Sequence, residues 1–220
     1  MRQSRILILA TAIFSIFNFQ FSICSAQITH TATGAVDETA NKIIKKAADK
    51  MNSGAFSVPV TVVNYDANKK EIFRQKADIT YKSPCYKVIA GDIELWCDGA
   101  SVWQVNRNTR EVVVNNMTKD DDDITNPAAL LANYKKNYRA KFIREENGTA
   151  IIDLQPKKGR TFHKLRLFIE TATGRLKKIE QHNYDSSRGE YTFGKYTPVK
   201  IAVEAFKYTA PKGYEIVDMR

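Results

Sequence analysis

The sequence contains few of the residues and motifs from which catalytic centres are built. Its 220 residues include three histidines and three cysteines. A G-x-S-x-G nucleophile motif, a glycine-rich phosphate-binding loop and an H-E-x-x-H zinc motif are all missing. We therefore expect a protein that is not an enzyme and that uses no cofactor.

A transmembrane-length hydrophobic run is also missing, and the N-terminus instead has the layout of a secretory signal peptide. Two arginines precede an apolar run at residues 6–21, which is shorter than the roughly 20 residues that span a bilayer. The run ends at Cys24-Ser25-Ala26, with small residues where signal peptidase reads. We expect residues 1–26 to be cleaved and residues 27–220 to form one domain. A retained anchor is a weaker alternative, as is a lipid on Cys24, because Phe21 and Ile23 stand before that cysteine where lipid attachment would require small residues.

Basic residues outnumber acidic ones by 34 to 24. Such an excess permits binding to nucleic acid or to an anionic membrane. The lysines and arginines are spread along the chain, however, and no nucleic-acid-binding motif accompanies them. We interpret the charge as a solvated surface and expect no nucleic-acid partner.

The two cysteines that follow the signal, Cys85 and Cys97, are candidates for a disulfide, because export leads to an oxidising compartment. Residues 81–89 and 93–98 read as neighbouring strands. A three-residue turn at 90–92 would place Cys85 opposite Cys97, within disulfide reach. We therefore predict a Cys85–Cys97 disulfide, and a shift of one residue in this register would undo it.

Hydrophobic periodicity predicts two helices in the first two thirds of the chain. Residues 40–51 place apolar side chains on one helical face behind Asp37 as N-cap. A second helix is expected after Asn126, an N-cap followed by Pro127 at the first helical position. The run Asp120–Asp123 before it reads as a solvated loop.

Elsewhere the period of two that is typical of strands prevails. Strands are expected at 56–62, 73–81, 86–89, 93–98, 103–114, 139–145, 149–155, 161–170, 175–184, 190–197, 201–208 and 214–218. The first five ranges, up to residue 114, follow one another as hairpins rather than as βαβ units. The fold class expected is mainly β: one large, curved antiparallel sheet with two or three helices on one side.

Two side-chain groups are candidates for chemistry in the strands. His163 and His182 face each other if residue 170 opposes residue 175, but no third ligand accompanies them, so we favour an ordinary strand pair over a metal site. Trp96 and Trp103, with Tyr86 opposite Trp96, form an aromatic row across three strands. Structural packing and a surface for an apolar ligand are both open interpretations of this row.

Five stretches carry a resemblance to a known family: residues 77–84, 93–103, 126–131, 167–180 and 206–218. They contain a strand that ends in K-x-P, a strand that enters an Asp-Gly turn with a tryptophan four residues after the glycine, an N-P helix start, and a closing F-x-x-x-x-P-x-G-x-x-V-x-D. In this order they resemble LolA, the periplasmic carrier of outer-membrane lipoproteins, in its Bacteroides-type branch.

The resemblance implies an unclosed half β-barrel, apolar inside, under a lid of helices. It implies a periplasmic monomer that takes triacylated lipoproteins from an inner-membrane lipoprotein-releasing ABC transporter, and it leaves the existence of an outer-membrane receptor open. The alternative is a periplasmic module of the same fold that binds another lipid or senses envelope stress. The acyl-binding residues expected are Phe56, Val58, Val60, Ile79, Tyr81, Ile89, Leu95, Val102, Leu130, Leu131 and Tyr134. Ile43, Ile44 and Ala47 are expected to join them from the first helix.

Two features limit this expectation. A one-residue slip would instead place Tyr86, Val88, Trp96 and Trp103 inside the sheet. Many family members also carry an arginine just before the K-x-P proline, where this chain has Ser83. Serine cannot form a charged, bidentate clamp. We therefore expect the lid to be held differently, through Lys82, the disulfide or a looser closure.

Overall fold

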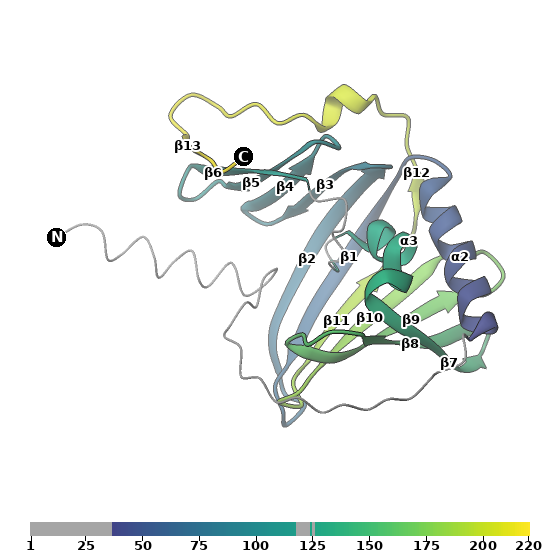
Figure 1. The fold of residues 1–220 in the computed structure, drawn as a ribbon. Helices are drawn as coiled ribbons and strands as arrows, with labels where there is room; N and C mark the ends of the chain where they lie inside the picture. The colour runs from purple at the N-terminus through teal and green to yellow at the C-terminus, as the bar shows by residue number, and fades with distance from the viewer. Residues whose placement is uncertain (1–36, 118–123, 125) are drawn as a thin grey trace.

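A computed structural model describes residues 37–117, 124 and 126–220. The expected signal peptide at 1–26 and the aspartates at 120–123 lie outside this part. Within it, thirteen strands form one curved sheet that does not close into a barrel, and two α-helices lie on its concave side (Figure 1). The elements are α2 (Glu38–Asn52), β1 (Phe56–Tyr65), β2 (Glu71–Lys82), β3 (Cys85–Ala90), β4 (Ile93–Cys97), β5 (Ser101–Asn106), β6 (Glu111–Asn116), α3 (Pro127–Asn137), β7 (Tyr138–Glu146), β8 (Thr149–Pro156), β9 (Phe162–Glu170), β10 (Leu176–Asn183), β11 (Arg188–Phe193), β12 (Thr197–Pro198), the 3-10 turn η1 (Val203–Phe206) and β13 (Glu215–Asp218).

The sheet consists of two antiparallel meanders joined side by side. Its strand order is β13-β6-β5-β4-β3-β2-β1-β11-β10-β9-β8-β7, and β12 pairs with the start of β1. The predicted mainly β fold with helices on one side is confirmed. The prediction of a wholly antiparallel sheet is wrong at one edge, because β13 pairs with β6 in parallel. The chain crosses the outer face before it reaches that edge, and so arrives in the direction of β6.

Both predicted helix starts are confirmed. The Asp37 carboxylate accepts a hydrogen bond from the Ala40 N–H at 2.9 Å and caps α2. The Asn126 side chain accepts one from the Ala129 N–H at 3.2 Å, with Pro127 in the first turn of α3. No helix in the described ranges is long and apolar enough to cross a membrane.

The strand predicted at 201–208 is wrong. The chain there leaves the sheet, forms η1, and runs over the outer face of β3–β6 (Figure 1). Phe206 is fully buried, whereas Val203 remains 43% exposed. An alternation of apolar residues therefore did not correspond to a buried strand face.

The turn between β3 and β4 differs from the prediction by one residue. Ala90 pairs directly with Ile93, so the turn consists of Gly91 and Asp92 alone. Gly91 adopts a φ of +62°, a left-handed conformation that suits glycine in a two-residue hairpin. As a result, the pairing of β3 with β4 is shifted by one residue from the predicted register.

This register removes the basis of the predicted disulfide. Tyr86, not Cys85, lies opposite Cys97, and Cys85 pairs with Lys82 in β2. Both cysteines are thiols in the structure and both are buried. The Cys97 sulfur accepts a hydrogen bond from the Gly99 N–H at 3.4 Å.

Candidate functional site

The concave face of the sheet is a continuous apolar surface. Cross-strand pairing aligns Phe56 with Tyr81, and Val58 with Ile79, on one face of β1 and β2. The same rows continue through β3 to β5, so that most of the predicted acyl-binding residues share this face. The row members are Phe56, Val58, Val60, Ile79, Tyr81, Tyr86, Val88, Leu95 and Val102.

Ile89 is the exception among the predicted strand residues. It lies opposite Asp78 in β2 and Glu94 in β4, on the outer face of the sheet. The cause is the two-residue turn at Gly91, which reverses the inward parity assumed for β3. Tyr86 and Val88 take the inward positions instead.

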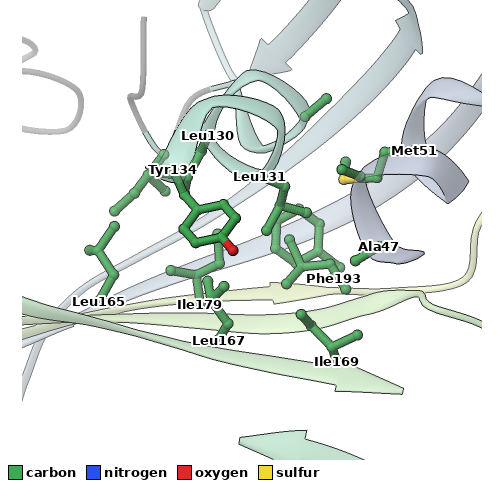
Figure 2. Close-up of a cluster of buried hydrophobic side chains, with 14 of the residues drawn as sticks. Ala47, Met51, Leu130, Leu131, Tyr134, Leu165, Leu167, Ile169, Ile179 and Phe193 are labelled. Atoms are coloured by element: carbon green, nitrogen blue, oxygen red, sulfur yellow. The ribbon is translucent and has the colours of Figure 1, made fainter. Parts of the chain in front are cut away.

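The second meander also contributes to the apolar surface, with residues that the sequence pattern alone did not assign to the site. Leu165, Leu167 and Ile169 of β9 are fully buried, and Ile179 and Phe193 join them from β10 and β11 (Figure 2). The sequence signal was partial: residues 165, 167 and 169 are apolar with Arg166 between the first two, but Phe168 interrupts the alternation.

The two helices fill the hollow of the sheet. Figure 2 shows Leu130, Leu131 and Tyr134 of α3 and Ala47 of α2 directed toward these strands. Each of them is at most 4% exposed. The predicted Ile44 is fully buried in the same cluster, and Ile43 packs against it while partly exposed.

Little space remains between helices and sheet. A cavity of about 10 Å³ is lined by Met51, Phe56, Val58, Ile79, Tyr81, Tyr86, Asn126, Pro127 and Phe193. A void of this size holds at most about one water molecule. In this structure the two helices therefore fill the apolar hollow of the sheet almost completely.

Polar contacts hold α2 against the sheet at both of its ends. At its start, the Asp37 carboxylate also accepts a hydrogen bond from the Phe142 N–H of β7 at 2.7 Å. Its hydrogen bonds from Ala40 and Phe142 lower the pKa of Asp37. At its end, the Tyr81 hydroxyl donates to the Asn52 side chain at 3.1 Å, and burial raises the pKa of Tyr81.

Further contacts act at the middle of α2. The Lys46 ammonium donates to the carbonyl oxygens of Thr171 and Ala172 at 2.7 and 2.9 Å, in the β9–β10 connection. The Tyr134 hydroxyl of α3 donates to the Asn41 side chain of α2. This last contact joins the two helices to each other, so they form one cover.

Lys82 does not hold this cover. Its ammonium donates to the Ile201 carbonyl at 2.7 Å and so binds the segment that leads to η1. The disulfide, the second expected device, is not formed. The helices are held instead by Asp37, Lys46 and Asn52, none of which the sequence analysis assigned to this role.

The aromatic row divides between the two faces. Trp96 and Trp103 lie opposite each other on the outer face, whereas Tyr86 points inward opposite Cys97. The tryptophans pack with Val105, Val112 and Val114 beneath Tyr208, Ala210 and Tyr214 of the C-terminal segment. The Trp96 and Tyr208 rings are 5.5 Å apart. The chain itself thus covers the surface that could have received an apolar ligand.

The two histidines also belong to the outer face. A bulge in β10 places His182 opposite Lys164 rather than His163, although the two imidazole rings are 6.1 Å apart. His182 contacts the Glu180 carboxylate at 3.1 Å. No group of three or more potential metal ligands occurs in the described part of the chain.

An apolar concave sheet under a cover of latched helices defines a half-barrel binding protein. Comparison with known families agrees: the family model described as outer membrane lipoprotein carrier protein LolA matches residues 75–209. The chain belongs to the LolA family. Its assignment to the Bacteroides-type branch stays a prediction.

Solved structures are similar to this chain at low sequence identity. An uncharacterized conserved protein from Thermus thermophilus superposes with a TM-score of 0.58 at 13% identity, over 82% of this chain and 99% of that chain. A LolA superfamily protein from Nitrosomonas europaea gives a TM-score of 0.44 at 11% identity, over 77% and 97%. A search of curated proteins gives no match.

Proposed function

We propose that this protein is a periplasmic carrier that shelters the acyl chains of lipoproteins between the concave sheet face and its helical cover. The triacylated lipoprotein would come from an inner-membrane lipoprotein-releasing ABC transporter and pass to the outer membrane. The observation that carries the proposal is an apolar face closed by helices that side-chain contacts hold in place. Membership of the LolA family supports the same role.

The energetics favour opening of the cover by cargo. Contacts at Asp37, Lys46 and Asn52 attach α2 to the sheet, and a protein hydrogen bond contributes about 1 kcal/mol net. Each methylene removed from water contributes about 0.8 kcal/mol, so a 16-carbon chain supplies roughly 12 kcal/mol. Relative to the same chain exposed in the aqueous periplasm, one sheltered acyl chain therefore outweighs the latching hydrogen bonds several-fold. Its contacts with the sheet replace the apolar contacts that the helices lose as they move away.

Periplasmic location in this proposal rests on the predicted signal at residues 1–26. Sequencing of the mature N-terminus tests it directly. A mature chain that begins at Gln27 supports a diffusible carrier, whereas a retained, lipid-modified Cys24 contradicts it.

The function is tested by cross-linking in the native cell, with a photoreactive residue at Leu95 and a matched control at Ile89. These positions are on neighbouring strands, but Leu95 faces the compartment and Ile89 the outer surface. We expect Leu95 to capture triacylated lipoproteins and Ile89 to capture none. Recovery of free lipid alone from Leu95 would favour the alternative of a different lipid ligand. Equal capture at both positions would refute the assignment of the concave face.

A further inference from the structure

A second cavity of about 200 Å³ opens beside the C-terminal end of α2. It is formed by the last turn of that helix, the loop into β1, the start of β10 and the chain around β12. Its lining residues are Lys50, Met51, Ser53, Gly54, Ala55, Phe56, Arg175, Tyr196 and Pro198. A cavity of about 150 Å³ accepts benzene, so this one has room for a segment of roughly six carbons.

The lining of this outer cavity combines an apolar wall with two cations. Met51 and Phe56 are at most 8% exposed and form the apolar side. Lys50 and Arg175 contribute the charges, and neither makes an ion pair or side-chain hydrogen bond with any residue in the described ranges. Two positive charges without a counter-charge beside an apolar wall suit an anionic head attached to a hydrocarbon chain.

Nearby negative charge does not cancel these cations. Asp49 is engaged by Lys45 at 2.6 Å. The C-terminal end of α2 carries roughly half a negative charge, and its Lys50 carbonyl already accepts a hydrogen bond from the Ser53 hydroxyl at 2.9 Å. The two full positive charges of Lys50 and Arg175 therefore exceed the partial negative charge at the end of the helix.

The outer cavity also adjoins the compartment under the cover. Met51 and Phe56 line both the 200 Å³ cavity and the 10 Å³ cavity at the sheet. A hydrocarbon chain whose head lies at Lys50 and Arg175 needs only displacement of these two side chains to reach the concave face.

We propose that the outer cavity is a binding site for a single-chain anionic amphiphile, such as a fatty acid, with its head between Lys50 and Arg175 and its chain against Met51 and Phe56. The site differs from the lipoprotein site, because an acylated cysteine brings no carboxylate of its own to these cations. The inference rests on the proposed function in one respect: both require the apolar interior to accept an acyl chain.

The test is calorimetric titration of the mature protein with decanoate, and with decanol and decyltrimethylammonium as neutral and cationic heads of equal chain length. We compare Lys50→Gln/Arg175→Gln with Lys42→Gln/Lys177→Gln, which removes one exposed cation from α2 and one from β10, both outside the cavity. Because each exposed charge pair contributes only modestly to affinity, we expect about fivefold to tenfold weaker decanoate binding in the first variant alone. Its binding should also lose most of its salt dependence.

A second variant tests the apolar wall without changing charge. Gly54 lines the cavity and a Cβ added there meets no atom within 4 Å, so Gly54→Leu is sterically accommodated and adds apolar volume at the lining. We expect it to weaken decanoate and decanol binding alike. Tighter binding of decyl phosphate than of decanoate would support the site and identify phosphate as the preferred head.

Equal affinity for decanoate and decanol, or equal loss in both charge variants, would overturn the proposal. Such a failure is separable from failure of the proposed function. Lipoproteins captured at Leu95 together with charge-independent decanoate binding would leave the carrier in place and remove the anionic site alone.

Discussion

Replacement of Leu131 by alanine tests whether the helical cover is packed as a true part of the core. Leu131 points from α3 toward Phe193 of the sheet (Figure 2) and is 1% exposed. Buried leucine-to-alanine changes cost about 2–5 kcal/mol, because transfer energy is lost and a cavity remains. We expect a loss of about 3 kcal/mol in the free energy of unfolding. For a domain of this size that corresponds to a fall of about 6–12 °C in Tm.

The same substitution should enlarge the compartment where the wild-type cavity is only about 10 Å³. Thermal unfolding followed by circular dichroism measures the stability, and fluorescence of the apolar probe N-phenyl-1-naphthylamine measures the space. The matched control is Lys135→Ala on the exposed side of α3, with an expected change below about 0.5 kcal/mol. An unchanged Tm together with unchanged probe binding for Leu131→Ala would refute the packing of α3 against the sheet.

Three further predictions concern the latch, the outer face and the cysteines. Asp37→Ala removes the acceptor for two N–H groups and should destabilise α2 by about 1–2 kcal/mol in hydrogen exchange. The folded-state pKa of Asp37 is lowered from its usual value of 3.8. The stabilisation of α2 by the Asp37 carboxylate is therefore fully present above pH 3.8 and is lost as the pH falls through the lowered pKa. The variant and the wild type should accordingly become equally stable in acid. Tyr208→Ala should expose the tryptophans of the outer face and shift their fluorescence emission to the red. An apolar ligand bound at the concave face should cause no such shift. A ligand-induced shift would contradict the placement of both tryptophans on the outer face. Cys85 and Cys97 should react with a thiol reagent only after denaturation, because both are buried and burial raises the pKa of Cys85; no reaction in denaturant would reveal a disulfide.

The sequence was informative wherever local chemistry decides the structure. Asp37 and Asn126 mark helix starts through their own side chains, and most strands show the alternation expected of a one-sided sheet. Ile89 was assigned to the wrong face, because the face of each β3 residue depends on the length of the turn that follows. The sequence around Gly91-Asp92 is compatible with a turn of two residues and with a turn of three.

Long-range contacts could not be predicted in this way. The parallel pairing of β13 with β6 joins segments about a hundred residues apart, and no local pattern specifies the direction of return. The latch at Lys46 ends on backbone carbonyls of the β9–β10 connection, which carry no sequence signature. For the same reason the cationic lining of the outer cavity, from Lys50 and Arg175, appears only in three dimensions.

The open edges of the sheet, at β13 and β7, have a consequence for the range of cargo. In a closed barrel the strand number and stagger fix the diameter, and therefore the volume inside. Here no hydrogen bonds join the two edge strands, so the interior width is set by sheet twist and by the position of the helices. A wall of this kind can widen or narrow without breaking a backbone ladder. If the proposed carrier function holds, we expect this wall to accept cargo with different numbers and lengths of acyl chains.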